Sequence, residues 1–304
     1  MSAEFPGGVS VPSGPRRLAR AVTAKLLELW LARELLLQLT RKELKVRYKS
    51  SALGFLWSMI TPVLMTLVFS VVFTLIVRIP VGDYPAFFIS GYLLWQFFQN
   101  SCQGAIHSIV GNGDLVKKVY FPREVLPLSH VLAQLVHLLL ALLVLSPYLI
   151  YTRGAQVLLY LPVTLVAVLL LTVFASGMAM WFAGVNVVFR DLQELFVVIF
   201  QVWFYATPVI YPLALVRATM PDRFAWIAGV LQANPTTWFV ELFRGGLYGP
   251  VEARLVEGEA VLVDAAPALP DPAAFGIAAL WAIAAFVFGY VVFLRRARTF
   301  AKEV

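Results

Sequence analysis

The chain has 304 residues, of which 61% are apolar and only 13% are Asp, Glu, Lys or Arg. Charged residues make up about 25% of an average soluble domain, so this composition excludes an ordinary soluble protein and indicates a membrane protein. The net charge of +7 does not by itself indicate a nucleic-acid partner, because the position of each Lys and Arg decides its meaning in a membrane chain.

The beginning of the chain predicts a flexible tail and then an amphipathic helix. Residues 1–27 start with a Gly-, Pro- and Ser-rich stretch and lack the apolar run and cleavage site of a signal peptide, so we expect a flexible cytosolic tail. Residues 28–50 predict a helix whose basic arc contains Gln38, Arg41, Lys42, Lys45 and Lys49. Its other side is mostly apolar, interrupted by Glu43 and Arg47. We expect this helix to lie on the cytoplasmic lipid surface, and a solvated helix before the first span is the alternative.

Six stretches with almost no charge are predicted to cross the membrane. They are residues 54–77, 85–110, 125–151, a span within 154–189 that begins with an interfacial lead-in, 195–211 and 273–294. Between residues 212 and 249 the apolar pieces are too short to cross, so we expect a pair of short re-entrant helices. Residues 250–272 are polar enough to form an exposed loop. The expected fold is an all-α polytopic membrane protein whose transmembrane domain occupies residues 51–304.

The positions of the basic residues predict the orientation. Six spans place both termini on the same face of the membrane, and with this topology that face holds 18 of the 24 Lys and Arg residues. Short cytoplasmic loops carry an excess of Lys and Arg. Both termini are therefore predicted to be cytoplasmic.

The spans lack the ionisable groups that ion-coupled transporters and intramembrane enzymes place at bilayer depth. His130 and His137 lie seven residues apart and share a face of the third span, but no Cys or carboxylate at ligand spacing joins them. We interpret both as neutral packing residues rather than a proton relay or a metal site. The chain also lacks a P-loop. We therefore expect no metal and no cofactor in this chain, and any energy must come from a partner protein.

The loop after the second span is the best candidate for that partner's docking element. Asp114 is placed to cap a short helix that stops before Pro122. An ordinary charged loop between two spans is the alternative interpretation.

Several short segments in a fixed order carry a family resemblance. They are the basic helix 39–48 leading into Gly54, Trp57 and Pro62, then residues 119–124 (VYFPRE), 189–191 (FRD), 206–212 (ATPVIYP), and Asn234–Pro235 before 241–244 (ELFR). From about residue 33 to the end, the chain resembles the membrane subunit of ABC-2 type exporters of lipid-linked polysaccharides, the O-antigen and teichoic-acid permeases. The N-terminal tail and the loop 250–272 are longer than the family pattern.

The resemblance implies a homodimer in a bacterial inner membrane, assembled with two copies of a separate ATPase that binds ATP and Mg. It implies a gate helix at 28–50, a coupling helix at 112–124 and outer gate helices at 212–249. The implied coupling residues are Asp114, Lys117, Lys118, Tyr120, Phe121, Pro122 and Arg123. The implied outer-gate residues are Pro208, Tyr211, Pro212, Asn234, Pro235, Glu241 and Arg244.

A glycan substrate suggests a conduit lined by aromatic rings and neutral polar groups. The candidate lining residues are Trp57, Tyr92, Trp95, Phe98, Trp203 and Tyr205, although such rings also form interfacial belts. The candidate binders of a polyprenyl-pyrophosphate headgroup are Arg41, Lys42, Lys45 and Arg47, which positive-inside anchoring also explains.

Two other functions fit parts of the pattern. An ABC-2 exporter of a drug or small lipid shares the architecture. A polytopic glycosyltransferase or acyltransferase would need a catalytic site at a membrane face, and Asp83, Asp222 and Glu241 form no evident one. Glu241 and Arg244, three residues apart on a helix, are expected to pair with each other.

Overall fold

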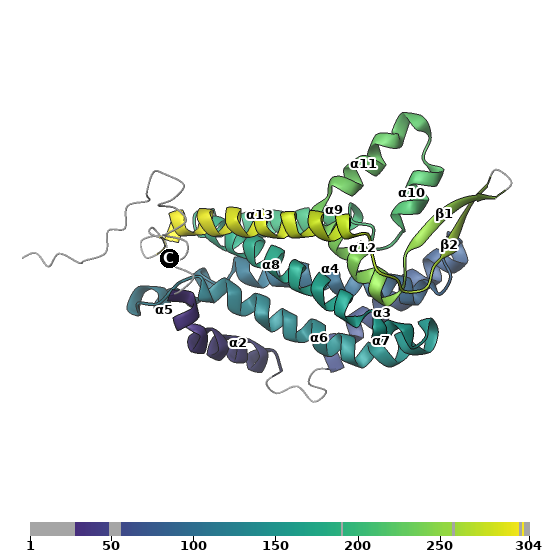
Figure 1. Cartoon of the computed structure of the whole chain (residues 1–304). Helices are drawn as coiled ribbons and strands as arrows, with labels where there is room; N and C mark the ends of the chain where they lie inside the picture. Colours follow the sequence, from purple (N-terminus) through teal and green to yellow (C-terminus); the bar gives the residue numbers. More distant parts are fainter. Residues whose placement is uncertain (1–27, 49–55, 190, 257–258, 298–299, 301–304) are drawn as a thin grey trace, which may run out of the picture.

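Long apolar helices that run along one axis dominate the structure (Figure 1). This computed structural model describes residues 28–48, 56–189, 191–256, 259–297 and 300, so the predicted tail 1–27 and Lys49 lie outside the described residues. The long helices are α3 (Leu56–Ser70), which continues as a π-helical segment η1 (Val71–Ile76), α4 (Tyr84–Ile106), α6 (Val125–Arg153), α8 (Leu161–Asn186), α9 (Leu192–Tyr205) and α13 (Pro272–Ala297). A four-residue helix, α7 (Gln156–Leu159), forms the predicted lead-in to α8.

Four of the six predicted spans are both long and apolar enough to cross a membrane: Leu56–Ile76, α6, α8 and α13. The predicted second span is the 23-residue helix α4, which carries polar side chains and packs against α3, α6, α8 and a later helix, α12 (Pro235–Leu247). Protein therefore surrounds much of α4, which reduces its need to be apolar.

The predicted fifth span is shorter than expected. Helix α9 has 14 residues and ends at Tyr205 instead of continuing to residue 211. At 1.5 Å per residue it is about 21 Å long, less than the ~30 Å hydrocarbon core. The chain leaves the helix just before Pro208, which has no backbone N–H with which to continue it.

The stretch between α9 and α13 differs from the prediction in two ways. Residues 212–249 contain three α-helices instead of a pair: α10 (Leu213–Thr219), α11 (Ala225–Ala233) and α12 (Pro235–Leu247), with a short 3₁₀ turn before α11. The predicted loop 250–272 contains a β-hairpin of β1 (Val251–Val256) and β2 (Glu259–Asp264), paired antiparallel from Val251↔Asp264 to Val256↔Glu259. The fold is thus mostly helical, but it is not all-α.

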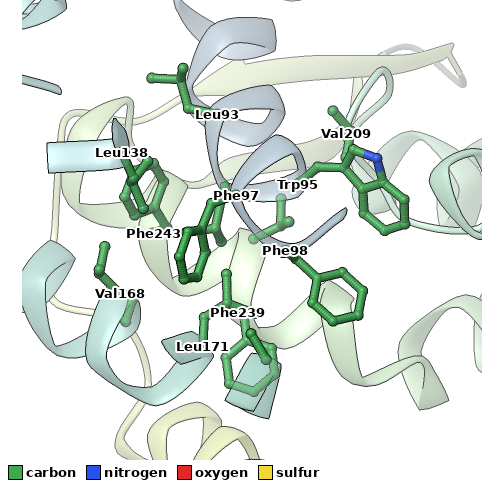
Figure 2. Close-up of a cluster of buried hydrophobic side chains, with 14 of the residues drawn as sticks. Leu93, Trp95, Phe97, Phe98, Leu138, Val168, Leu171, Val209, Phe239 and Phe243 are labelled. Atoms are coloured by element: carbon green, nitrogen blue, oxygen red, sulfur yellow. The ribbon is translucent and has the colours of Figure 1, made fainter. Parts of the chain in front are cut away.

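Aromatic and aliphatic side chains of α4, α6, α8 and α12 form the core. In Figure 2, Leu93, Phe97 and Phe98 of α4 lie among side chains from the neighbouring helices, including Leu138, Val168, Leu171, Phe239 and Phe243. Helix α13 closes on α8 where Gly177 and Gly289 meet, and a Cβ on either glycine would overlap backbone atoms of the other helix.

The two ends of the bundle differ in the elements that they carry (Figure 1). At the basic end lie α2 (Arg33–Tyr48), a short helix α5 (Gly113–Lys118) and the last turn of α13 with Arg295 and Arg296. At the hairpin end lie α7, β1 and β2, and the helices α10 and α11 project from the bundle on this side. We use these two names below.

Candidate functional site

The predicted coupling segment is divided into an exposed face and an anchored face. Asp114 and Lys118 form an exposed ion pair of 3.4 Å, Lys117 is also exposed, and Tyr120 is 94% exposed. Val116 is buried, and Phe121 packs against a cluster that includes side chains of α8 and α13. One face is therefore available to a partner, and the other is fixed to the membrane helices.

The helix in this segment is shorter than predicted. Only Gly113–Lys118 is α-helical within the predicted 112–124, Asn112 ends a 3₁₀ turn before it, and Pro122 lies in the non-helical part that follows. The residue at the helix N-cap is Asn112, whereas Asp114, the predicted cap, lies in the first turn. A carboxylate in the first turn still interacts favourably with the helix dipole, so Asp114 stabilises the helix from a different position.

Arg123 holds the segment to the end of the last long helix. Its guanidinium donates to the carbonyl of Ala297, the final residue of α13, where helix carbonyls lack partners within the helix. Burial lowers the pKa of Arg123, while the neighbouring Glu124 acts in the opposite direction. A guanidinium stays protonated under such a shift, so Arg123 acts as an anchor.

Helix α2, the predicted gate helix, packs against α6, so part of the face expected to lie on lipid contacts protein, while Val46 on the same face is 63% exposed. The two charged residues that interrupt that face explain the difference. Arg47 donates to the Gln134 side chain of α6 at 3.0 Å, and Glu43 lies 3.6 Å from the His130 ring. Arg41, Lys42 and Lys45 remain exposed on the other side. Lys42 also reaches the Asn112 side chain at 3.4 Å, which connects α2 to the coupling segment.

The predicted outer-gate residues, which are far apart in sequence, meet at one place. Asn234 caps α12 by accepting from the Thr236 backbone N–H at 3.2 Å, and Pro235 occupies the first helical position. The same Asn234 side chain donates to the Ala206 carbonyl at 2.9 Å and accepts from the Trp203 indole at 2.8 Å. The turn before α12 is thereby joined to the end of α9.

Arg244 completes this junction from the interior of α12. It is 2% exposed, pairs with Glu241 at 3.3 Å as predicted, and donates to the Val209 carbonyl at 3.1 Å. Its guanidinium carbon lies 3.9 Å from the centre of the Phe87 ring, next to Gly91 of α4. Pro208 and Pro212 are buried in the same segment, and Tyr211 donates to the Tyr205 carbonyl at 2.8 Å.

The β-hairpin is fixed by residues that the sequence analysis did not single out. Tyr248 donates to the Asp264 carboxylate at 2.6 Å and also contacts the Gly82 carbonyl. Arg153 donates to the Tyr248 carbonyl at 2.8 Å and lies 3.9 Å from the centre of the Tyr248 ring. Burial and the bond to Asp264 raise the pKa of Tyr248, so its hydroxyl stays protonated as a donor.

The candidate lining aromatics do not form one surface. Trp95 and Phe98 are 2% and 1% exposed and pack against Phe200 and Trp203 in the core, so neither lines a conduit in this conformation. Trp57 and Tyr205 are 58% and 51% exposed, and Tyr92 and Trp203 are half-buried. The lining role stays a prediction for these four rings.

Known proteins are similar to this chain in sequence over most of its length. Residues 34–248 match the ABC-2 type transporter family. A Klebsiella pneumoniae protein named O-antigen export system permease protein RfbA is 34% identical over 218 residues, covering 70% of this chain and 81% of the relative. A Myxococcus xanthus protein of the same name is 34% identical over 278 residues, covering 91% of this chain and 98% of the relative.

Proposed function

This chain belongs to the ABC-2 type transporter family, and from that premise we propose that it is the permease subunit of an ATP-driven O-antigen exporter. Its substrate is a polysaccharide attached to a polyprenyl-pyrophosphate lipid, and it works as a homodimer with two copies of a separate ATPase. The names and coverage of the relatives support the O-antigen class over a drug or small lipid.

The coupling segment carries the proposal of an ATPase partner. Its exposed face presents Tyr120, a large aromatic side chain that is 94% exposed, next to charged Lys117 and Lys118. Tyrosine is enriched at protein interfaces. Because Phe121 and Arg123 fix the other face to α8 and α13, a push on this segment is passed to the membrane helices.

The distribution of charge sets the proposed orientation in the bacterial inner membrane. The basic end carries α2, the coupling segment and the Arg residues at the end of α13, so we place it in the cytoplasm with both termini. In this orientation α4, and α9 together with the non-helical residues 206–212 that follow it, complete six crossings with the four long apolar helices, and α10, α11 and α12 lie near the outer face as the outer gate.

Headgroup binding is proposed for the exposed basic residues of α2. Arg41, Lys42 and Lys45 face away from α6 and lie at the level of the inner leaflet in this orientation. Each such residue attracts anionic lipid by about 1 kcal/mol near the surface. Arg47, in contrast, is engaged with Gln134, so it is removed from the set of free headgroup ligands.

Complementation of a deletion strain tests the function. We expect deletion of the gene to abolish surface O-antigen on lipopolysaccharide gels and to cause accumulation of lipid-linked glycan inside the cell, with wild type restoring both. Tyr120→Ala should reach the membrane in normal amounts but restore little O-antigen, because the ATPase contact is lost. Tyr151→Ala is the matched control, since Tyr151 is 89% exposed at the opposite end of the bundle. Normal surface O-antigen in the deletion strain would refute the proposed function.

A further inference from the structure

Two adjoining cavities lie between α2, α3, α4 and α6 toward the basic end. Their volumes are about 400 and 320 Å³, and both are lined by Arg47, Asn100, Gln134 and His137. Ligand pockets usually measure about 300–1,000 Å³. We refer to the two together as the inner cavity, and its size suits one sugar ring.

Two polar stripes face this cavity from neighbouring helices. On α4, Gln96, Asn100 and Gln103 follow one another at intervals of four and three residues, which places them on one helix face. On α6, His130, Gln134 and His137 repeat the same intervals. The two histidines that the sequence analysis interpreted as packing residues thus belong to a continuous polar lining.

The amides of the α4 stripe are available to a ligand. Gln96, Asn100 and Gln103 are half-buried, and none of them forms a side-chain hydrogen bond to another described residue. Each amide offers donors and an acceptor. Three amides aligned on one face of the cavity can pair with several hydroxyl groups at once, so their arrangement favours a ligand that is rich in hydroxyl groups.

The charges of the cavity argue against a pyrophosphate inside it. Glu43 supplies a negative charge close to Arg47, whose guanidinium already donates to Gln134 at 3.0 Å. The free basic residues Arg41 and Lys45 are exposed on the opposite side of α2. A lipid pyrophosphate is therefore better placed outside the cavity on those residues, with its attached sugar reaching inside.

The remaining wall is mostly apolar, with Ser58 and Thr61 among its residues, and it includes an aromatic ring. Trp57, 58% exposed at the start of α3, lines the larger part together with Leu93, Phe97 and Leu138. Leu93 and Leu138 of this wall appear at the edge of the core cluster in Figure 2. An indole face next to a row of amides is suited to a sugar, whose C–H face packs on the ring while its hydroxyls reach the amides.

We propose that the inner cavity is a saccharide-binding site that holds the lipid-proximal sugar of the substrate inside a single subunit before transport. This assignment rests on the proposed function and adds to it a point of sugar recognition. Hydrogen bonds from the neutral side chains of Asn100 and Gln134 select the sugar. The pyrophosphate headgroup, bound outside the cavity, contributes the same affinity for any polyprenyl pyrophosphate.

Binding of two defined lipids to the full chain in nanodiscs tests the proposal. The probes are undecaprenyl pyrophosphate and the same lipid carrying one N-acetylglucosamine. We expect wild type to bind the sugar-bearing lipid about tenfold more tightly, the difference that two hydrogen bonds provide. Asn100→Leu and Gln134→Leu should each remove most of that preference while binding of the sugar-free lipid persists. Gln201→Leu, an amide change on the exposed side of α9, should leave the preference unchanged.

A thiol-protection measurement covers the case in which a leucine variant fails to fold. Asn100→Cys introduces a single accessible thiol, because the natural Cys102 is buried. We expect the sugar-bearing lipid to slow maleimide labelling several-fold more than the sugar-free lipid. Equal protection by the two lipids would assign the cavity to a headgroup and overturn the proposal. The proposal would also be overturned if wild type bound neither lipid, or if both leucine variants kept the preference for the sugar-bearing lipid. The proposed function is decided separately, by surface O-antigen in the deletion strain.

Discussion

The hairpin end and the basic end of the bundle satisfy their polar groups in opposite ways. Near the hairpin end, Asn234 and Arg244 bond to the carbonyls of Ala206 and Val209, and Tyr84 donates to the Ile210 carbonyl at 2.7 Å. At the basic end, the amides of the α4 stripe line a cavity, and Tyr120 and Lys118 are exposed. The polar groups of the hairpin end are therefore used in contacts within the subunit, whereas polar groups of the basic end remain available to a ligand or a partner protein.

This difference separates an end with a fixed arrangement of contacts from an end whose polar groups are available for binding. A segment whose carbonyls accept hydrogen bonds from several side chains has one favoured arrangement and changes only when several contacts break together. Exposed charged pairs and cavity-facing amides form and break at little cost, which suits contact with a substrate or a partner. In the proposed exporter, the hairpin end is thus the more rigid end, and the basic end offers its polar groups to the substrate and the ATPase.

Replacement of Arg244 should break the hairpin end most severely. Arg244→Met leaves the buried Val209 carbonyl without its donor, which costs about 1–3 kcal/mol, and removes the contact with the Phe87 ring, worth up to about 2 kcal/mol. The Glu241 carboxylate, in contrast, is 39% exposed and is solvated by water. We expect a correspondingly large loss in the free energy of unfolding measured in detergent with a chemical denaturant. Arg223→Met, at an exposed position, is the control, and equal losses in the two variants would contradict the anchoring role.

A smaller change on α4 tests the same contact from the other side. A Cβ on Gly91 would overlap the Arg244 guanidinium, so Gly91→Ala should displace it and lower stability by about 1–3 kcal/mol. Gly229→Ala on α11 is the matched control, because a Cβ there meets nothing within 4 Å and alanine is the better helix former. The denaturant midpoint should fall for Gly91→Ala and stay or rise for Gly229→Ala. The opposite order would show that Gly91 is not needed for close packing.

The polar contacts of the basic end should contribute least to stability. Lys42→Ala removes an exposed hydrogen bond of 3.4 Å to Asn112, and such surface contacts are worth about 0–1 kcal/mol. The midpoint of unfolding should hardly move, although α2 loses its polar connection to the coupling segment. A loss as large as that of Arg244→Met would remove the distinction between the two ends.

Much of the bundle follows from charge-free runs in the sequence. The apolar stretches that become α3, α6, α8 and α13 contain almost no charge, so their length alone identifies them. The pairing of Glu241 with Arg244 was also predictable, because three residues on a helix fix their separation. Local sequence pattern is sufficient in these cases. The two paired residues lie in the same helix, and a helix that is surrounded by lipid must be apolar along its length.

Contacts between distant segments were not predictable in the same way. Glu43 and Arg47 looked like interruptions of an apolar face because their partners His130 and Gln134 belong to another helix. The hairpin was missed, although Val251–Val256 and Glu259–Asp264 are short runs rich in Val and separated by a glycine-containing pair, a pattern typical of strands. Trp95 and Phe98 looked like lining residues because aromatic content does not reveal which face of a helix meets protein.

Translocation in a purified system tests the central claim most directly. Proteoliposomes would contain this chain, its ATPase and a lipid-linked O-antigen, with glycan protection from an added glycosidase as the readout. The account predicts that ATP addition moves glycan across the bilayer only when both proteins are present, and that Tyr120→Ala abolishes this movement while the ATPase still hydrolyses ATP. Transport by this chain without the ATPase, or full transport by Tyr120→Ala, would contradict it.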